Sequence, residues 1–176
     1  MSSFPRDISA KIQHSLAEFS VSDVNSGNRD LLGPEASWLY DYAYRNVSTG
    51  GVPMRADLEP NDMKHLLPDV MILEPEIENG SLADIKIRLA GSRMTSFYGP
   101  VSGTSLRSLN NATVVDRGFK CVAAVLASGQ PVLGHSVKMS ADLPYFQVTL
   151  LFIPLVDENG KIDQIFAHFS AAPERD

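Results

Sequence analysis

The chain has 176 residues, of which 44% are hydrophobic and 20% are charged, and its formal net charge at pH 7 is -6. This length and composition are ordinary for one globular domain with its own core, and the negative charge argues against binding to nucleic acid. The single cysteine excludes an internal disulfide and suits a reducing, cytoplasmic compartment, and we expect neither a signal peptide nor a membrane partner, because no apolar run has the necessary length.

Residues 1–33 are predicted to form an N-terminal helix followed by a linker. Asp7 can cap this helix, whose apolar stripe is Ile8, Ile12, Leu16 and Phe19. The polar stretch SVSDVNSGNRD, residues 20–30, indicates the linker. Because an apolar stripe needs a surface to cover, we expect a homodimer through this helix, with packing on its own domain as the alternative.

Between residues 34 and 90 the sequence predicts helices followed by a β-hairpin. The aromatic stretch SWLYDYAYR belongs to the first helix, and we interpret its rings as core packing rather than as a binding surface. Asn79-Gly80 is a strong tight-turn signal between two apolar runs, so the strands on either side are predicted to pair. The predicted elements are a helix opening at Gly33-Pro34, a short helix from Glu59 to Leu67, and strands over residues 70–73 and 85–90.

Residues 91–109 are predicted to arch over the sheet and to leave a cavity beneath. Gly91, Gly99 and Gly103 interrupt this stretch, so only short helical turns fit between them. Such turns do not pack against a sheet as a continuous slab, and pockets form beneath segments of this kind. Two alternatives stay open here, since apolar side chains either line this cavity or fill it.

The C-terminal third is predicted to hold the longest helix and three strands. Thr113 and Asp116 have capping-box spacing at the start of the helix, and Gly129 marks its end. Asn159-Gly160 marks a hairpin turn between the last two strands. We expect the strands over residues 131–139, 145–155 and 162–169, and a polar tail over residues 171–176.

Together these elements predict an α+β fold: a five-stranded antiparallel sheet with helices on one face and an N-terminal helical extension. The first two strands form one hairpin, the last three pair as neighbours, and the longest helix lies between the two groups. The corresponding divisions are residues 1–33 for the helix and linker, 34–170 for the domain, and 171–176 for the tail.

The order and spacing of these motifs resemble a PAS domain, the sensory fold of many bacterial signalling proteins. FIPLVDENGKIDQIFAHF, residues 152–169, is similar to the closing hairpin of PAS domains. RLAGSRMTSFYGPVSGTSL, residues 88–106, and PMRADLEPNDMKHLLPDVMILE, residues 53–74, resemble segments of a smaller family of stand-alone alphaproteobacterial PAS proteins, although Ser92 stands where threonine is usual. The resemblance covers about residues 35–170.

This resemblance implies a non-enzymatic sensory module for signal transduction. Phe169 is followed by SAAPERD rather than by the Asp-Ile-Thr end that links PAS domains to an output domain, so the expected output is contact with a signalling protein. The Asn-Cys-Arg motif of flavin photosensors is also missing. We therefore expect a cytoplasmic sensor that binds a small molecule or a protein partner, and its cofactor stays unknown.

The candidate ligand-binding residues are those expected to face the cavity. His135 stands out, because an imidazole on the apolar face of a strand can bind a haem iron or a polar ligand. The alternative is a core histidine satisfied by a neighbouring carbonyl, and His168 offers the same two alternatives. No two histidines have a metal-ligand spacing, so we predict no metal site. The candidate set is Leu89, Tyr98, Phe119, Val122, His135 and Phe146.

Basic residues are in excess between residues 85 and 120. They can hold a phosphate or carboxylate group, or they can form a solvated rim that acidic residues elsewhere balance. These residues are Lys86, Arg88, Arg93, Arg107, Arg117 and Lys120, against the single acid Asp116.

Two further functional hypotheses stay open. A small enzyme with the cone-shaped α+β fold of ketosteroid-isomerase relatives would use Tyr98 together with Asp142 or Asp116 as its acid. Those enzymes place their helices before most of the sheet, whereas here the longest helix falls between the second and third strands, which favours the sensory module. The other hypothesis is a pure dimerisation scaffold with a filled core.

Overall fold

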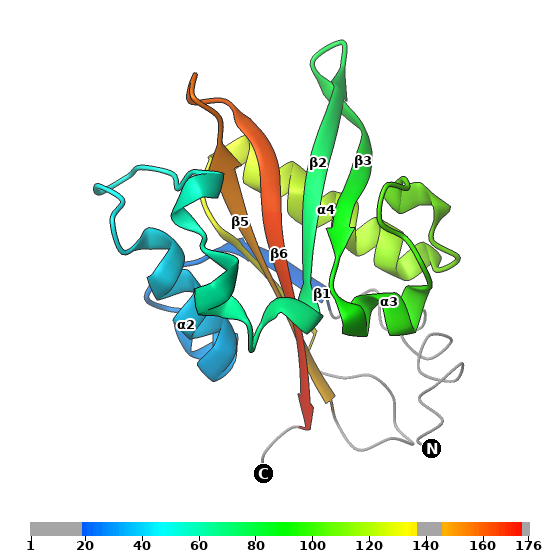
Figure 1. Cartoon of the computed structure of the whole chain (residues 1–176), viewed down its shortest axis with the longest axis horizontal. Helices are drawn as coiled ribbons and strands as arrows, with labels where there is room; N and C mark the ends of the chain where they lie inside the picture. Colours follow the sequence, from blue (N-terminus) through cyan, green and yellow to red (C-terminus); the bar gives the residue numbers. More distant parts are fainter. Residues whose placement is uncertain (1–18, 137–145, 174–176) are drawn as a thin grey trace.

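A computed structural model of the chain describes residues 19–136 and 146–173 (Figure 1). Within this range, six antiparallel strands form one sheet in the order β1-β4-β5-β6-β2-β3, which confirms the predicted α+β class and the antiparallel sheet. No helix in this range is long and apolar enough to cross a membrane. The strands are β1 (Phe19–Asp23), β2 (Val70–Glu78), β3 (Ser81–Ala90), β4 (Val132–Ser136), β5 (Phe146–Val156) and β6 (Ile162–Pro173), and the α-helices are α2 (Gly33–Tyr44), α3 (Ser92–Tyr98) and α4 (Ala112–Ser128).

Two tight hairpins join neighbouring strands where the sequence predicts them. β2 and β3 meet at Asn79-Gly80, where both residues have positive φ angles, 51° and 79°, as a type I′ turn requires. β5 and β6 meet at a turn that contains Gly160. β6 continues to Pro173, which pairs with Phe146, so residues 171–173 belong to the sheet and not to a polar tail.

The sheet has one strand more than predicted, because residues 19–23 form β1 rather than a helix end and a linker. β1 pairs with β4, from Phe19 opposite Ser136 to Asp23 opposite Val132. Phe19 and the valine two residues later pack against the core beside α4, whereas the serine that follows each of them is exposed. This alternation is that of a strand, and it prevails over the helical spacing of Phe19 with earlier residues. The rest of the predicted N-terminal helix lies outside the described residues.

Helices cover both faces of the sheet. α3 and α4 lie on one face, in line with the prediction, whereas α2 packs on the opposite face (Figure 1). Successive residues of β5 supply the two cores, since Leu151 and Ile153 pack beside α2 and Phe152 packs beside α4. Because strand side chains alternate between faces, an unbroken apolar run such as this one predicts a sheet covered on both sides.

α4 spans nearly the predicted residues but begins with a different cap. The side-chain oxygen of Asn111 accepts a hydrogen bond from the Val114 N–H at 3.1 Å and caps the helix. The predicted capping box of Thr113 and Asp116 is wrong. The Asp116 carboxylate does not return to the start of the helix but pairs at 3.0 Å with Lys120, one turn further along it. The helix ends at a left-handed glycine, as predicted.

Candidate functional site

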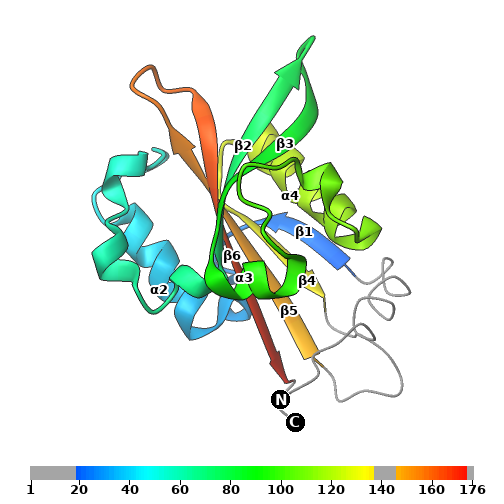
Figure 2. The ribbon, with the colours of Figure 1, turned by 45° about the vertical axis from the view of Figure 1, so that its right-hand side comes forward.

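The arch, residues 91–109, is held to the sheet at its start and along its middle (Figure 2). A Cβ on Gly91 would lie 2.0 Å from the carbonyl oxygen of Leu67, so only glycine fits where the arch leaves the sheet. Further along, the Ile87 N–H of β3 donates to the carbonyl oxygen of Thr104 at 2.8 Å. This bond covers part of the outer edge of β3, which would otherwise be open to pairing with another chain.

A cavity of about 120 Å³ lies between the arch and the sheet, where the sequence predicts one. Met94, Tyr98 and Leu106 of the arch form its roof, and its floor includes Leu73 of β2 and Phe152 of β5. An engineered apolar cavity of about 150 Å³ in another protein binds benzene. By that standard, the cavity has room for a molecule of about one ring.

α4 closes one side of the cavity with Gly118 and Arg117. A Cβ on Gly118 would lie 2.6 Å from Cδ2 of Leu106, so this glycine allows the arch to approach the helix closely. Arg117 is 4% exposed, and its guanidinium carbon lies 4.6 Å from the ring centroid of Phe19. Burial lowers the pKa of Arg117, but a guanidinium in a protein keeps its charge. The cavity, whose lining is largely apolar, therefore has a positive charge in the wall that α4 contributes, while Asp69 and His168 lie elsewhere in the lining.

Tyr98, which the sequence names as a site residue, lines the cavity. Burial raises the pKa of its hydroxyl, and the charge of Arg117 acts in the opposite direction. The phenol is therefore protonated at neutral pH, and it can both donate and accept a hydrogen bond. Tyr98 and Arg117 are the two groups from which a bound molecule could gain polar contacts at this wall.

Three other predicted site residues lie away from the cavity. Val122 is fully buried among the core residues beneath α4, and Phe119 lies under the guanidinium of Arg107, at 4.2 Å. Leu89 is 50% exposed. The register of β3 with β2 shifts between Ile87 and Leu89, so the alternation is reset and Leu89 faces the side opposite to Ile87. The sequence pattern alone, with its strict alternation, could not indicate this bulge.

His135 lies on the opposite face of the sheet from the cavity. The residue before it, Gly134, faces α4, since a Cβ there would lie 3.0 Å from Cys121 Sγ, and the next side chain along a strand points the other way. His135 is buried, burial lowers its pKa, and its Nδ1 lies 3.4 Å from the hydroxyl of Thr149. Phe146 begins β5, but its side chain lies outside the described part of the structure.

The basic residues near the arch have partners of their own. Arg88 pairs with Glu74 at 3.3 Å, and Arg107 donates to the carbonyl oxygen of Ala83 at 3.0 Å. This arrangement matches the alternative of a rim that acidic and carbonyl groups balance. Among these basic residues, Arg117 is the one that the structure places in the cavity wall, and it is buried there.

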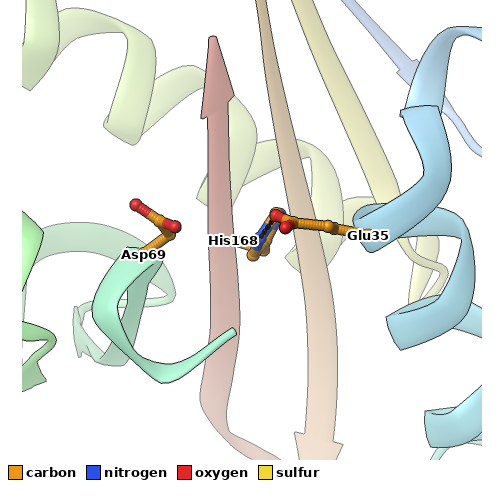
Figure 3. A group of neighbouring side chains, drawn as sticks. All are labelled: Glu35, Asp69 and His168. Atoms are coloured by element: carbon orange, nitrogen blue, oxygen red, sulfur yellow. Dashed lines mark ion pairs between the residues drawn. The ribbon is translucent and has the colours of Figure 1, made fainter. Parts of the chain in front are cut away.

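Three ionisable side chains from distant segments of the chain meet beside the cavity (Figure 3). Glu35 comes from the first turn of α2, Asp69 from the 3₁₀ turn Leu67–Asp69, and His168 from β6, and one ligand atom of each lies within 4.8 Å of the others. Asp69 and His168 also line the cavity. Burial lowers the pKa of His168, while the charges of Asp69 and Glu35 oppose that shift.

Sequence reasoning placed His168 on the last strand but missed its neighbours. Spacing along the chain carries no signal for three residues from three separate elements. The available signal is a polar residue in an apolar strand, because such a side chain needs a partner wherever it is buried. That signal identifies His168 but not Glu35 or Asp69.

Comparisons with known proteins give a matching family model, a distantly similar curated protein and weakly similar solved structures. A family model described as a PAS domain matches residues 34–169. A curated NAD kinase from Edwardsiella ictaluri (strain 93-146) is 25% identical over 190 residues, and the match covers 91% of this chain but 65% of the relative's length. Among solved structures, an RNA-binding light-oxygen-voltage receptor has a TM-score of 0.43 at 12% identity, covering 86% of this chain and 38% of that one. A light-oxygen-voltage domain studied with a flavin analogue has a TM-score of 0.41 at 18% identity, covering 65% of this chain and 84% of that one.

Proposed function

Since the chain belongs to the PAS domain family, whose model matches residues 34–169, we propose that it is a sensory module that binds a small molecule beneath the arch. The observation that carries this proposal is the cavity of about 120 Å³ between the arch and the sheet. Protein cores leave few voids larger than a water molecule, so a cavity of this size in a well-packed domain is a natural place for a ligand.

The chemistry of the cavity indicates the class of ligand. Its walls are largely apolar side chains, with Arg117 and Tyr98 on one side, and the lining also includes Asp69, whose charge is offset by its ion pair with Arg93. A charge in a low-dielectric wall attracts an anionic group strongly. We therefore propose a ligand of about one ring or a short chain that carries a carboxylate or a similar anionic group.

The size of the cavity argues against larger ligands. A flavin has three fused rings, and a dinucleotide is larger still, so neither fits a space of about 120 Å³. Cys121, the chain's single cysteine, lies on α4 and is fully buried in the core beneath that helix. We accordingly propose neither a flavin photosensor nor the phosphoryl transfer that the name of the NAD kinase relative implies.

We also propose that the module is not an enzyme. A ketosteroid-isomerase mechanism would need an acid beside Tyr98, and the Asp116 carboxylate instead pairs with Lys120. The other candidate acid, Asp142, lies outside the described residues. A pure dimerisation scaffold with a filled core is the less favoured alternative, because the cavity leaves space inside the domain.

Native mass spectrometry of the freshly purified full chain tests ligand binding directly. We expect a mass above that of the denatured chain by one small molecule. Ala167 lines the floor on β6, so Ala167→Leu should fill part of the cavity and lower the retained fraction at least tenfold. Ala123→Leu adds the same atoms on the exposed side of α4 and should retain the ligand. Equal retention in both variants would contradict the proposal.

A thermal-shift series tests the ligand class. Benzoate should raise the melting temperature of the wild-type chain more than toluene does, because only benzoate offers an anion to Arg117. Arg117→Met keeps the approximate length and removes the charge, so it should abolish the preference for benzoate. If Arg117→Met still prefers benzoate to toluene, the anionic group does not bind beside Arg117.

We further propose that the module reports through protein contacts, including the predicted homodimer through the N-terminal helix. The argument is the apolar stripe described above, which includes Ile12 and Leu16. Light scattering of the wild-type chain should give the mass of a dimer. The double change Ile12→Asp and Leu16→Asp should give a monomer, and a dimer that persists would exclude this contact.

A further inference from the structure

We propose that Glu35, Asp69 and His168 bind a divalent transition-metal ion, with Zn²⁺ as the reference. The three side chains converge from α2, from the turn before β2, and from β6 (Figure 3). This site is distinct from the proposed ligand-binding function, although two of its residues also line the cavity. The inference rests on three observations: the state of the histidine, the anchoring of one carboxylate, and the freedom of the other.

His168 is buried and has a lone pair to offer. It is 1% exposed, and neither ring nitrogen has a hydrogen-bond partner within the described residues. Its Nε2 lies 3.8 Å from Oε2 of Glu35, which is beyond hydrogen-bond distance. Buried polar groups nearly always have a partner, and a neutral imidazole is the commonest protein ligand for a transition metal. A metal ion between His168 and the carboxylates would provide a partner for one of the two ring nitrogens.

Asp69 is held in place for this role. It is 6% exposed, and Nη1 of Arg93 donates to its two carboxylate oxygens at 2.7 and 2.6 Å. A carboxylate has about four lone-pair positions, so the pair with Arg93 leaves some of them available. Metal-ligating carboxylates commonly accept hydrogen bonds from outer-shell groups that orient them. Arg93 would act in this way as a positioning residue.

Glu35 can supply the movement that closes the site. Its side chain is 55% exposed at the first turn of α2, so it can change rotamer without disturbing the core. The ligand atoms lie within 4.8 Å of one another. Tetrahedral ligands about 2.1 Å from a zinc ion are about 3.4 Å apart, so no pair has to close by more than about 1.5 Å. The pair of His168 and Glu35, at 3.8 Å, needs only a small shift of the exposed glutamate side chain.

The mixture of donors selects the class of metal. One imidazole nitrogen and two carboxylate oxygens suit Zn²⁺, Co²⁺ and Mn²⁺, whereas Mg²⁺ and Ca²⁺ take six or more oxygen ligands. The two carboxylates carry two negative charges, one of which is offset by the ion pair of Asp69 with Arg93. With three protein ligands, a fourth coordination position stays open for water or another small molecule.

A metal titration of the full chain tests this inference. After treatment with a chelator and dialysis, the protein is titrated with Zn²⁺ by calorimetry and with Co²⁺ by visible absorption. We expect one ion per chain, with Co²⁺ bands that indicate a nitrogen and oxygen environment. Absence of saturable binding in the wild type would overturn the proposal.

Matched variants locate the ion. Glu35→Gln changes an exposed side chain and leaves the fold intact, and it should weaken Zn²⁺ binding at least tenfold, as should His168→Gln. The controls are Glu76→Gln and His65→Gln, which change exposed residues of the same types and should bind as the wild type does. Unchanged affinity in Glu35→Gln, or an equal loss in His65→Gln, would show that the ion binds elsewhere and would overturn the proposal.

Discussion

The two faces of the sheet are packed differently, although the same strands build both. On the α2 face, large apolar side chains such as Leu39, Leu58 and Leu66 are 0–1% exposed and pack in one cluster with residues of the sheet. On the α4 face, the helix packs closely, but the arch beside it stands over a cavity. The difference follows from the covering segments, since α2 is a regular helix and the arch is a series of short turns.

Because of this contrast, we expect the two faces to contribute differently to the stability of the fold and to ligand binding. A regular helix presents a continuous apolar stripe that a sheet can match along its whole length. The arch is interrupted by glycines and is held by backbone hydrogen bonds to β3, so its position does not depend on filling the space below. We expect the α2 face to supply most of the free energy of folding and the arch face to tolerate, and respond to, changes in the cavity.

The largest expected effect is therefore on the α2 face. Leu39→Ala removes a fully buried side chain from the core between α2 and the sheet. We expect the free energy of unfolding to fall by about 3–5 kcal/mol, as for other buried leucines with rigid surroundings. Urea unfolding followed by circular dichroism measures it. Leu31→Ala, at a position that is 40% exposed, is the control and should cost less than about 1 kcal/mol.

The matching change on the arch face should cost less and alter binding more. Leu106 is 3% exposed and forms part of the cavity roof. Leu106→Ala should lower the free energy of unfolding by about 2 kcal/mol, at the low end for buried leucines, because the cavity already deprives this side chain of contacts. The enlarged cavity should accept two-ring probes that do not stabilise the wild type. If Leu106→Ala costs more than Leu39→Ala, the proposed contrast between the faces is wrong.

A third change tests the wall that α4 contributes to the cavity. Asn111 is 8% exposed and its side chain caps the first turn of α4. Asn111→Ala should lower the free energy of unfolding by about 1 kcal/mol, the usual cost of losing an N-cap. Because Val114 in that turn lines the cavity, ligand affinity should fall as well. The neighbouring Asn110 is exposed, and Asn110→Ala should change neither quantity; an equal loss in both variants would argue against the cap.

The sequence predicts the strands and hairpins well because their signals are local. Asn79-Gly80 requires left-handed backbone at both turn residues, and few other pairs adopt it, so the β2–β3 hairpin follows directly. The arch follows from its glycines for the same reason. The structure of residues 19–23 was harder to predict, because five residues can either continue the apolar stripe of a helix or alternate as a strand. The choice is decided by β4, whose otherwise unpaired edge forms hydrogen bonds with these residues.

The site is less predictable because it depends on which face each side chain takes. His135 and Leu89 both follow an apolar alternation in the sequence, yet one faces α2 and the other lies beyond a bulge. Alternation shows that two faces exist but not which of them lies under the arch. Tyr98 is different because it lies on the arch itself, so that its position did not depend on strand register.

The smallest expected effect is a pH dependence that arises on the α2 face. Burial lowers the pKa of His135 in the folded protein below its ordinary value of about 6.5. As the pH falls through about 6.5, the unfolded chain takes up a proton at His135 while the folded chain does not. The free energy of unfolding should therefore be independent of His135 above pH 7 and should decrease below pH 6.5.

The decrease should be less than about 1 kcal/mol per pH unit, under the limit of about 1.4 kcal/mol for a proton that is fully suppressed. Urea unfolding of wild type and His135→Gln at pH 7.5, 6.5 and 5.5 measures it, and the variant should have the shallower slope. A slope that is the same in both proteins would mean that His135 gains a proton as readily when folded, which would contradict its burial.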